Sequence, residues 1–326
     1  MNKKSLAALA VLGCFAASAS AQSSLQIYGF ADGGLEYVNS SIDGVASKFG
    51  LASGQQSGSR FGLKGSEALN GSLKLVFQLE SGFAIDDGKT TMSMSDGSSR
   101  LFGREARLGL EGQFGSLNFG RFGTLGSGAG SVNMLDDADP FSTGFVDAGV
   151  QATQAFTVLR VDNAVAYKTP KLAGLQGGVM YSFATEGNEQ AGADRNNRYS
   201  GVALTYGVGK LWAAASYEQI QPSQVNPTLA DDEVFKLALN YDFGVIKPYL
   251  AYSHAEGAQK FGRLSLAGTG AKSDSYMLGL TAPLLGGKLM ASVQYLDADL
   301  NSVLGEDAER TVASVGYDYP LSRRTN

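Results

Sequence analysis

Three aspartates in one long connection are the residues of this chain best placed for charge-based chemistry. Asp136, Asp137 and Asp139 lie within 124–161, a stretch without a clear strand pattern. Their carboxylates could bind calcium through oxygen ligands, line a narrow aqueous passage, or form an ordinary solvated loop. A loop this long in a compact domain is usually functional. We therefore expect this loop to have a functional role, and we expect no metal or cofactor.

The chain is poorly supplied with residues for catalysis. Cys14 is the only cysteine and His254 the only histidine. Without a second histidine or a thiolate, a zinc site or a Ser/His centre is hard to assemble. The glycine-rich stretch 126–130 precedes no convincing helix, and the spacing before Gly88-Lys89-Thr90 does not fit a phosphate-binding loop. We predict no catalytic residues, and an outer-membrane hydrolase that uses His254 is the enzymatic alternative.

Alternation of apolar and polar residues with a period of two is the main structural signal. In 235–243, one face carries Phe235, Leu237, Leu239, Tyr241 and Phe243, and the other carries Lys236, Ala238, Asn240 and Asp242. The pattern recurs from residue 24 to 319 without a helical segment to cover an apolar face. Segments of about ten alternating residues are typical of transmembrane β-barrels. We predict an all-β, antiparallel barrel that is apolar outside and wet inside.

About fourteen strands can be placed, and the connections between them alternate between short and long. The strands are expected at 24–37, 59–67, 72–85, 100–112, 116–123, 162–169, 175–185, 198–206, 211–220, 232–243, 246–256, 274–282, 288–298 and 309–319. In outer-membrane barrels, short turns face the periplasm and long loops face outward. A soluble sandwich, which is the secreted adhesin alternative, has no reason to follow this rhythm.

The N-terminus has the features of a secretory signal. Lys3 and Lys4 precede an apolar run at 5–17, and Ala19-Ser20-Ala21 is a small-x-small cleavage site. We expect residues 1–21 to be the signal peptide and 22–326 to be the barrel. Without the two lysines, 24 basic residues face 31 acidic ones, a net charge of −7. This balance argues against a nucleic-acid partner.

Short characteristic segments are spread along the whole chain. They are LQIYG at 25–29, SRFGLKG at 59–65, FQLESGF at 77–83, FGSLNFGR at 114–121, NAVAY at 163–167 and LSRRT at 321–325. In this order they resemble the general porins of Gram-negative β-proteobacteria. The resemblance implies a sixteen-stranded homotrimer in the outer membrane, in contact with lipid and lipopolysaccharide. It also implies passive diffusion of ions and small hydrophilic solutes without a cofactor.

The end of the chain departs from the porin pattern. The family ends in a strand that closes on phenylalanine, whereas 320–326 reads as a turn. An open sheet would expose about ten backbone groups at each edge to lipid, at several kcal/mol apiece. We therefore expect a barrel of sixteen strands of which about fourteen are present here, with the last strands missing.

The resemblance also assigns a role to the aspartates. In these porins the third long loop folds into the lumen and narrows it, with loop acids opposite wall arginines. Position by position, the wall arginines correspond to Arg60, Arg104 and Arg160. Arginine stays charged at ordinary pH and so holds a fixed field. Because the screening length is about 8 Å, charges at the narrowest point should control selectivity more than net charge does.

Strand parity supplies weaker candidates for the lumen. Lys64 shares the face of Arg60, while Lys74 and Glu80 lie opposite a row of apolar residues. Arg121 is near the base of the long loop. Arg107 has odd parity relative to Arg104 and is predicted to face outward. Three arginines favour anions and three aspartates favour cations, so the sequence leaves selectivity open.

Overall fold

The chain folds almost entirely into β-strands. The structure, a computed structural model, describes residues 24–41, 46–141, 145, 148–154, 158–225, 231–257, 260–261, 264–265, 271–300 and 307–326. The predicted signal peptide, 1–21, lies outside the described residues. Two single-turn 3-10 helices occur, η1 (Val150–Ala152) and η2 (Ala193–Arg195). No helix in the described part of the chain is long and apolar enough to cross a bilayer.

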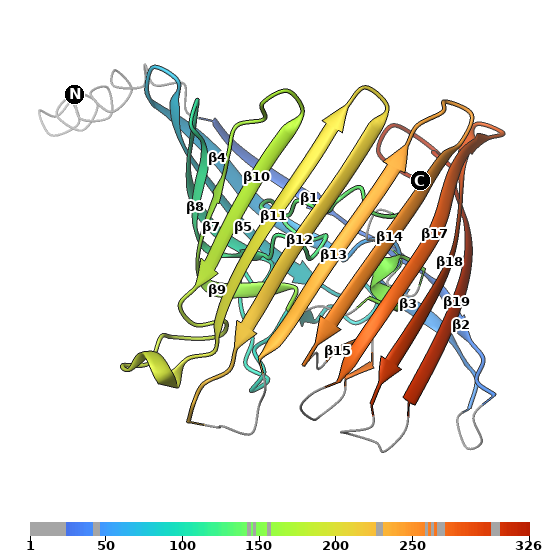
Figure 1. Cartoon of the computed structure of the whole chain (residues 1–326). Coiled ribbons are helices and arrows are strands. Elements are labelled where there is room, and N and C mark those ends of the chain that lie inside the picture. The colour runs from blue at the N-terminus through green and yellow to red at the C-terminus, as the bar shows by residue number, and fades with distance from the viewer. Residues whose placement is uncertain are drawn as a thin grey trace, which may run out of the picture.

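Fourteen strands follow one another in a single antiparallel sheet that curves around a central space (Figure 1). In hydrogen-bonded order they are β1 (Ser24–Phe30), β4 (Arg60–Asn70), β5 (Leu73–Phe83), β7 (Glu105–Gly112), β8 (Gly115–Gly123), β9 (Arg160–Lys168), β10 (Leu175–Ser182), β11 (Arg198–Val208), β12 (Leu211–Gln221), β13 (Asp232–Tyr241), β14 (Lys247–Glu256), β17 (Lys272–Leu284), β18 (Gly287–Asp299) and β19 (Asp307–Asp318). Each of these strands pairs with the strands before and after it in this order, which is also their order along the chain, as the rhythm of turns predicts. The short connections gather at one end of the sheet and the long ones at the other.

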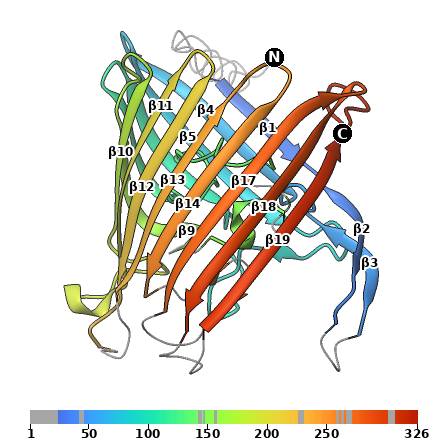
Figure 2. The same ribbon diagram turned by 45° about the vertical axis from the view of Figure 1, so that its right-hand side comes forward.

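The first predicted strand, 24–37, is divided in the structure. It breaks after β1, and β2 (Gly33–Val38) pairs instead with β3 (Lys48–Ser53) in a hairpin that leaves the curve of the sheet (Figure 2). The Asp32 carboxylate causes the break, because it accepts hydrogen bonds at 2.8–3.0 Å from the backbone N–H groups of Gln55, Gln56 and Ser57. The alternation of residue types continues through this break, which is why parity alone missed it. Short strands also lie in long connections, namely β6 (Thr90–Thr91), β15 (Lys260–Phe261) and β16 (Leu264–Ser265).

Burial in the sheet is the reverse of that in a soluble protein. Along β13, Lys236 and Asn240 each keep only 3% of their surface exposed, whereas Leu237 and Leu239 keep 43% and 41%. The polar face therefore points into the curve of the sheet and the apolar face points outward. This arrangement is stable only where hydrocarbon covers the outer face. The predicted transmembrane barrel is confirmed in its inside-out patterning.

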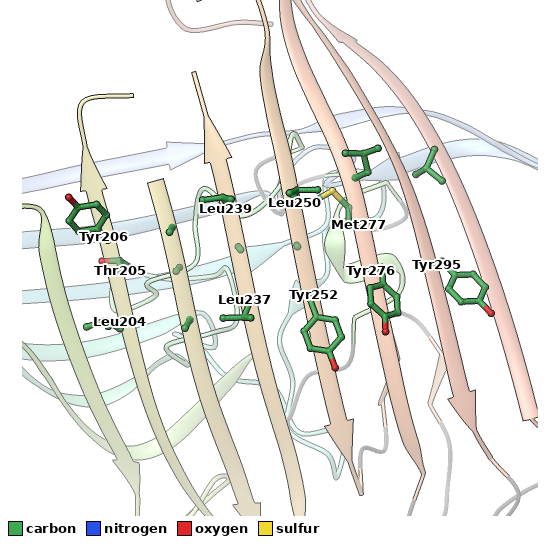
Figure 3. A pocket seen from close by; sticks show the side chains of 17 residues that line it. Leu204, Thr205, Tyr206, Leu237, Leu239, Leu250, Tyr252, Tyr276, Met277 and Tyr295 are labelled. Atoms are coloured by element: carbon green, nitrogen blue, oxygen red, sulfur yellow. The ribbon is translucent and has the colours of Figure 1, made fainter. Parts of the chain in front are cut away.

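The outer face carries one shallow apolar concavity (Figure 3). Its volume is about 710 Å³, and it lies over β11–β14, β17 and β18. Ala213 and Ala215 on β12 form a low point because larger side chains, Leu204, Tyr206, Leu237 and Leu239, flank them in register. The hydroxyl groups of Tyr252, Tyr276 and Tyr295 point the same way, toward the end of the long loops. Such tyrosines are typical of a membrane interface.

A charge placed on this outer face should obstruct insertion. We expect Leu239→Arg to destabilise the folded barrel by up to about 2–4 kcal/mol, because the charged side chain would enter the hydrocarbon that covers the apolar outer face. Unfolding in lipid vesicles measures this change. Val245→Arg is the matched control, since Val245 lies in a short turn and is 77% exposed. Equal stability of the two variants would contradict an outer face immersed in lipid.

A hydrophobic core lies inside the sheet, where the connection between β8 and β9 folds into the central space (Figure 1). We refer to this connection, 124–159, as the inner loop. Its buried residues, among them Leu125, Met134 and Val150, pack against small inward residues such as Ala214 and Ala238. The expectation of a wet interior is thus too simple, because the inner loop fills part of the interior with apolar contacts. A polar cavity remains on the side of β1–β9.

Candidate pore constriction

The inner loop is attached to the far wall at its first turn. Gly126 donates its N–H to Glu218 on β12 at 3.1 Å, and its carbonyl accepts from the Lys236 ammonium on β13 at 2.9 Å. The Tyr199 hydroxyl donates to the same Glu218 oxygen at 2.6 Å. Glu218, Lys236 and Tyr199 are each at most 3% exposed. We call this group the Gly126 clamp, and its buried opposite charges make it sensitive to the loss of either partner.

Two further attachments continue along the wall. Asn240 on β13 donates to the backbone carbonyl of Asp137 at 2.7 Å, and the Lys247 ammonium on β14 contacts both oxygens of the Asp137 carboxylate at 2.7–2.8 Å. Beyond them, Thr153 of the inner loop donates to Gln294 on β18 at 2.9 Å and accepts from Ser275 on β17 at 2.8 Å. The loop therefore crosses the bore and is bound at both ends of its path.

The space left open is a polar cavity of about 830 Å³ between the inner loop and the wall. Arg60 at the start of β4, Arg104 just before β7 and Arg160 at the start of β9 all line it. Asp136 lines it from the inner loop. Four of the six residues predicted for the constriction thus meet in one cavity, although they span 100 positions of sequence.

Glu80 organises the arginines. Its carboxylate accepts from Arg104 Nε at 2.6 Å, lies 3.8 Å from Arg60 Nε, and accepts from the Tyr28 hydroxyl at 2.8 Å. Arg160 Nε donates to the backbone carbonyl of Arg104 at 2.8 Å. These contacts fix the guanidinium groups at the cavity wall. Arg104 and Arg160 donate through Nε, whereas Arg60 donates through Nη1 to the Ser57 hydroxyl at 3.0 Å and to the Gly58 carbonyl at 3.2 Å. Parity correctly predicted that Glu80 faces the interior.

The three aspartates of the inner loop are in different surroundings. Asp136 is exposed at the cavity. Asp137 forms the ion pair with Lys247 described above, on the opposite side of the loop. Asp139 is 1% exposed, and its carboxylate accepts the backbone N–H of Phe141 at 2.7 Å and of Val150 at 3.4 Å. Asp139 therefore shapes the loop from within and does not line the cavity.

The weaker candidates lie outside the cavity, Glu80 excepted. Lys64 is exposed on β4, with its ammonium 5.2 Å from the ring centre of Tyr28, and Lys74 is exposed on β5. Arg121 binds Asp162 at 2.7 Å, and Arg100 binds the same carboxylate at 2.9 Å. These contacts place Arg121 in a separate ionic cluster at the base of the loop.

The prediction for Arg107 is wrong. Arg107 faces the interior, where its Nη1 donates to Asn118 at 2.5 Å. The error comes from counting parity from Arg104, because β7 begins only at Glu105 and Arg104 lies outside the strand. In register, Arg107 is opposite Gln78, which shares the inward face of Glu80. Sequence reasoning also missed Glu105 and Lys168, which line the cavity. Glu105 has the same parity as Arg107, so the same error in the strand boundary concealed it.

The described residues contain no group of three or more histidine, cysteine or acidic side chains that could hold a metal ion. Asp137 and Asp139 bind different partners and Asp136 lines the polar cavity, so the three carboxylates do not converge. His254 lies on β14 with Asp274 at 3.0 Å and Glu256 at 3.6 Å. Its serine neighbours Ser253 and Ser275 point to the opposite, inward face. This arrangement does not support the hydrolase alternative.

An inside-out antiparallel sheet around a folded-in loop and a charged passage defines a channel-forming barrel of the outer membrane. Comparison with known proteins leads to the same class. A family described as Gram-negative porin matches residues 7–326. An outer membrane porin protein of Bordetella pertussis is 36% identical over 99% of this chain and 92% of its own length. Outer membrane porin protein 32 of Delftia acidovorans is 33% identical over 99% of this chain and 87% of its own length.

Solved structures give the same result. An anion-selective porin from Comamonas acidovorans superposes with a TM-score of 0.73 at 27% identity, covering 93% of this chain and 86% of that one. OmpF of Salmonella typhi, at 17% identity and a TM-score of 0.65, shares the fold. The chain belongs to the Gram-negative porin family. It is an outer-membrane general diffusion channel, and the predicted family, fold class and location are confirmed.

Proposed function

We propose that the cavity between the inner loop and β1–β9 is the selective constriction of the channel, and that it favours anions. The observation that supports this proposal is the balance of charge among the side chains that line the cavity. Four cationic side chains, Arg60, Arg104, Arg160 and Lys168, face three carboxylates, Glu80, Glu105 and Asp136. Glu105 is further engaged by the backbone N–H and hydroxyl of Ser131 at 2.6 and 2.8 Å.

The inner loop contributes less negative charge to the passage than its sequence suggests. Asp137 is neutralised by Lys247, and Asp139 is buried, so Asp136 is the aspartate of this group that acts on a passing ion. Two unit charges 10 Å apart interact by about 0.4 kcal/mol in water and about 1.7 kcal/mol at an effective dielectric of 20. A net cationic lining at a narrow point therefore favours anions over cations. The anion-selective neighbour from Comamonas acidovorans supports the same preference.

Planar bilayer recordings test this function. The purified protein should give stepwise conductance, and the reversal potential in a potassium chloride gradient should have the sign of chloride preference. Absence of conductance would contradict the channel itself, whereas a potassium preference would contradict only the anion assignment. Uncharged sugars of increasing size, added to liposomes, measure the width of the passage.

We also infer that the channel is a homotrimer in contact with outer-membrane lipid and lipopolysaccharide. The resemblance to trimeric porins supports the subunit number. The outward face of β1 supports a large apolar contact, since Leu25 and Ile27 are 69% and 77% exposed. Chemical crosslinking in native outer membranes should give a ladder that ends at three subunits. If crosslinking gave monomers alone, the result would contradict the trimer.

A further inference from the structure

A second cationic cavity lies between the constriction and the end of the barrel that carries the short turns. Its volume is about 370 Å³, and its lining includes Arg107, Lys168 and Glu111, together with residues of the turns that follow β7 and β9. Lys168 and Ser131 line both this cavity and the constriction. An ion that leaves the constriction toward the short turns therefore meets Lys168 and Arg107 next.

Both cations keep unused hydrogen-bonding capacity. Within the described residues, the Lys168 ammonium has neither an ion-pair nor a hydrogen-bond partner, and the charged groups near enough to act on it are Asp136, Arg107 and Glu111. Arg107 binds Asn118 through Nη1, but its buried Nε has no partner. A buried donor without an acceptor costs free energy. Arg107 Nε is such a donor, and the unpaired Lys168 ammonium lines the same cavity, so the two together indicate a place for an acceptor that the described part of the chain does not supply.

We propose that Arg107 and Lys168 form a second anion site, periplasmic of the constriction, that binds the oxygens of phosphate and of small carboxylate solutes. Guanidinium and ammonium groups together suit an oxyanion, because charge-assisted hydrogen bonds to it are short and strong. The neighbouring Glu111 opposes tight binding. Conduction requires sites that attract an ion and yet release it, and two weak sites in series satisfy both needs. The inference rests on the proposed anion preference and extends it along the bore.

The test is block of chloride current by inorganic phosphate, which is added to one side of a bilayer at a time. For the wild-type channel we expect saturable block, with higher affinity from the side of the short turns. The double variant Arg107→Gln/Lys168→Gln should lose at least tenfold in phosphate affinity from that side. Lys168→Arg keeps the charge and should retain the block. Lys171→Gln is the matched control, because it removes a lysine from the same turn outside the cavity.

The outcomes separate this site from the constriction. Block that is unchanged in the double variant, or block that is equally lost in Lys171→Gln, would overturn the second site while the channel stays anion-preferring. Wild-type channels that prefer chloride but show no saturable phosphate block would also overturn it. A potassium preference in the wild type would instead contradict the proposed function. Migration of each variant as the same heat-stable oligomer on gels verifies assembly. If the double variant fails to assemble, Arg107→Gln alone should still weaken block, because Arg107 lines this cavity and not the constriction.

Discussion

Replacement of Arg60, Arg104 and Arg160 together by glutamine is expected to shift the channel from chloride toward potassium preference. All three guanidinium groups line the 830 Å³ cavity, where an ion passes within about one screening length of each. At separations near 10 Å, each charge changes the free energy of an ion by about 0.4–1.7 kcal/mol. We expect the ratio of anion to cation permeability to fall on the order of tenfold or more. The reversal potential in a salt gradient measures this ratio.

A variant that removes a negative charge from the same cavity should change selectivity in the opposite direction. Glu80→Gln removes the carboxylate that neutralises Arg104 and Arg60, so it should increase chloride preference. Arg195→Gln, in the loop helix η2, removes one arginine far from the cavity and should leave the potential unchanged. If the triple variant behaved as Arg195→Gln does, the arginines would not belong to the constriction.

Loss of the Gly126 clamp should release the inner loop from the wall. In Lys236→Met the new side chain has a similar volume, but the carbonyl of Gly126 loses its hydrogen-bond donor. Glu218 then remains buried without the nearby ammonium group. Removal of one partner from a buried opposite-charge pair typically costs about 3–5 kcal/mol. We expect larger and noisier single-channel conductance, and unfolding in detergent at a lower temperature.

The second partner supplies the internal control for this prediction. The double variant Lys236→Met/Glu218→Gln should recover part of the lost stability, because it leaves no uncompensated charge in the interior. Lys210→Met changes an exposed lysine in a short turn and should alter neither property. Current noise in Lys236→Met equal to that of the wild type would show that the other attachments alone fix the loop.

Local pattern predicts most of the sheet. Alternation in β13 follows directly from the period of two in an extended chain, and polar turns fix where each strand ends. The errors occur where side chains make contacts at a distance. Asp32 divides the first strand by binding N–H groups more than 20 residues away. Arg107 faces inward because the strand begins at Glu105, a boundary that alternation does not mark.

The sequence by itself determined the class of the protein, because alternating strands with apolar outer faces are stable only in a membrane. It also indicated which loop is special, because 124–161 is too long to be a simple connection. Only the tertiary structure decided which charges act in the passage. Asp136, Asp137 and Asp139 are nearly adjacent in sequence, but one faces the cavity, one pairs with Lys247 and one is buried in the loop. The physical reason is that a carboxylate's effect on a passing ion depends on its burial and its partners. The folded loop supplies these for Asp139, and a strand 110 residues away supplies the partner of Asp137.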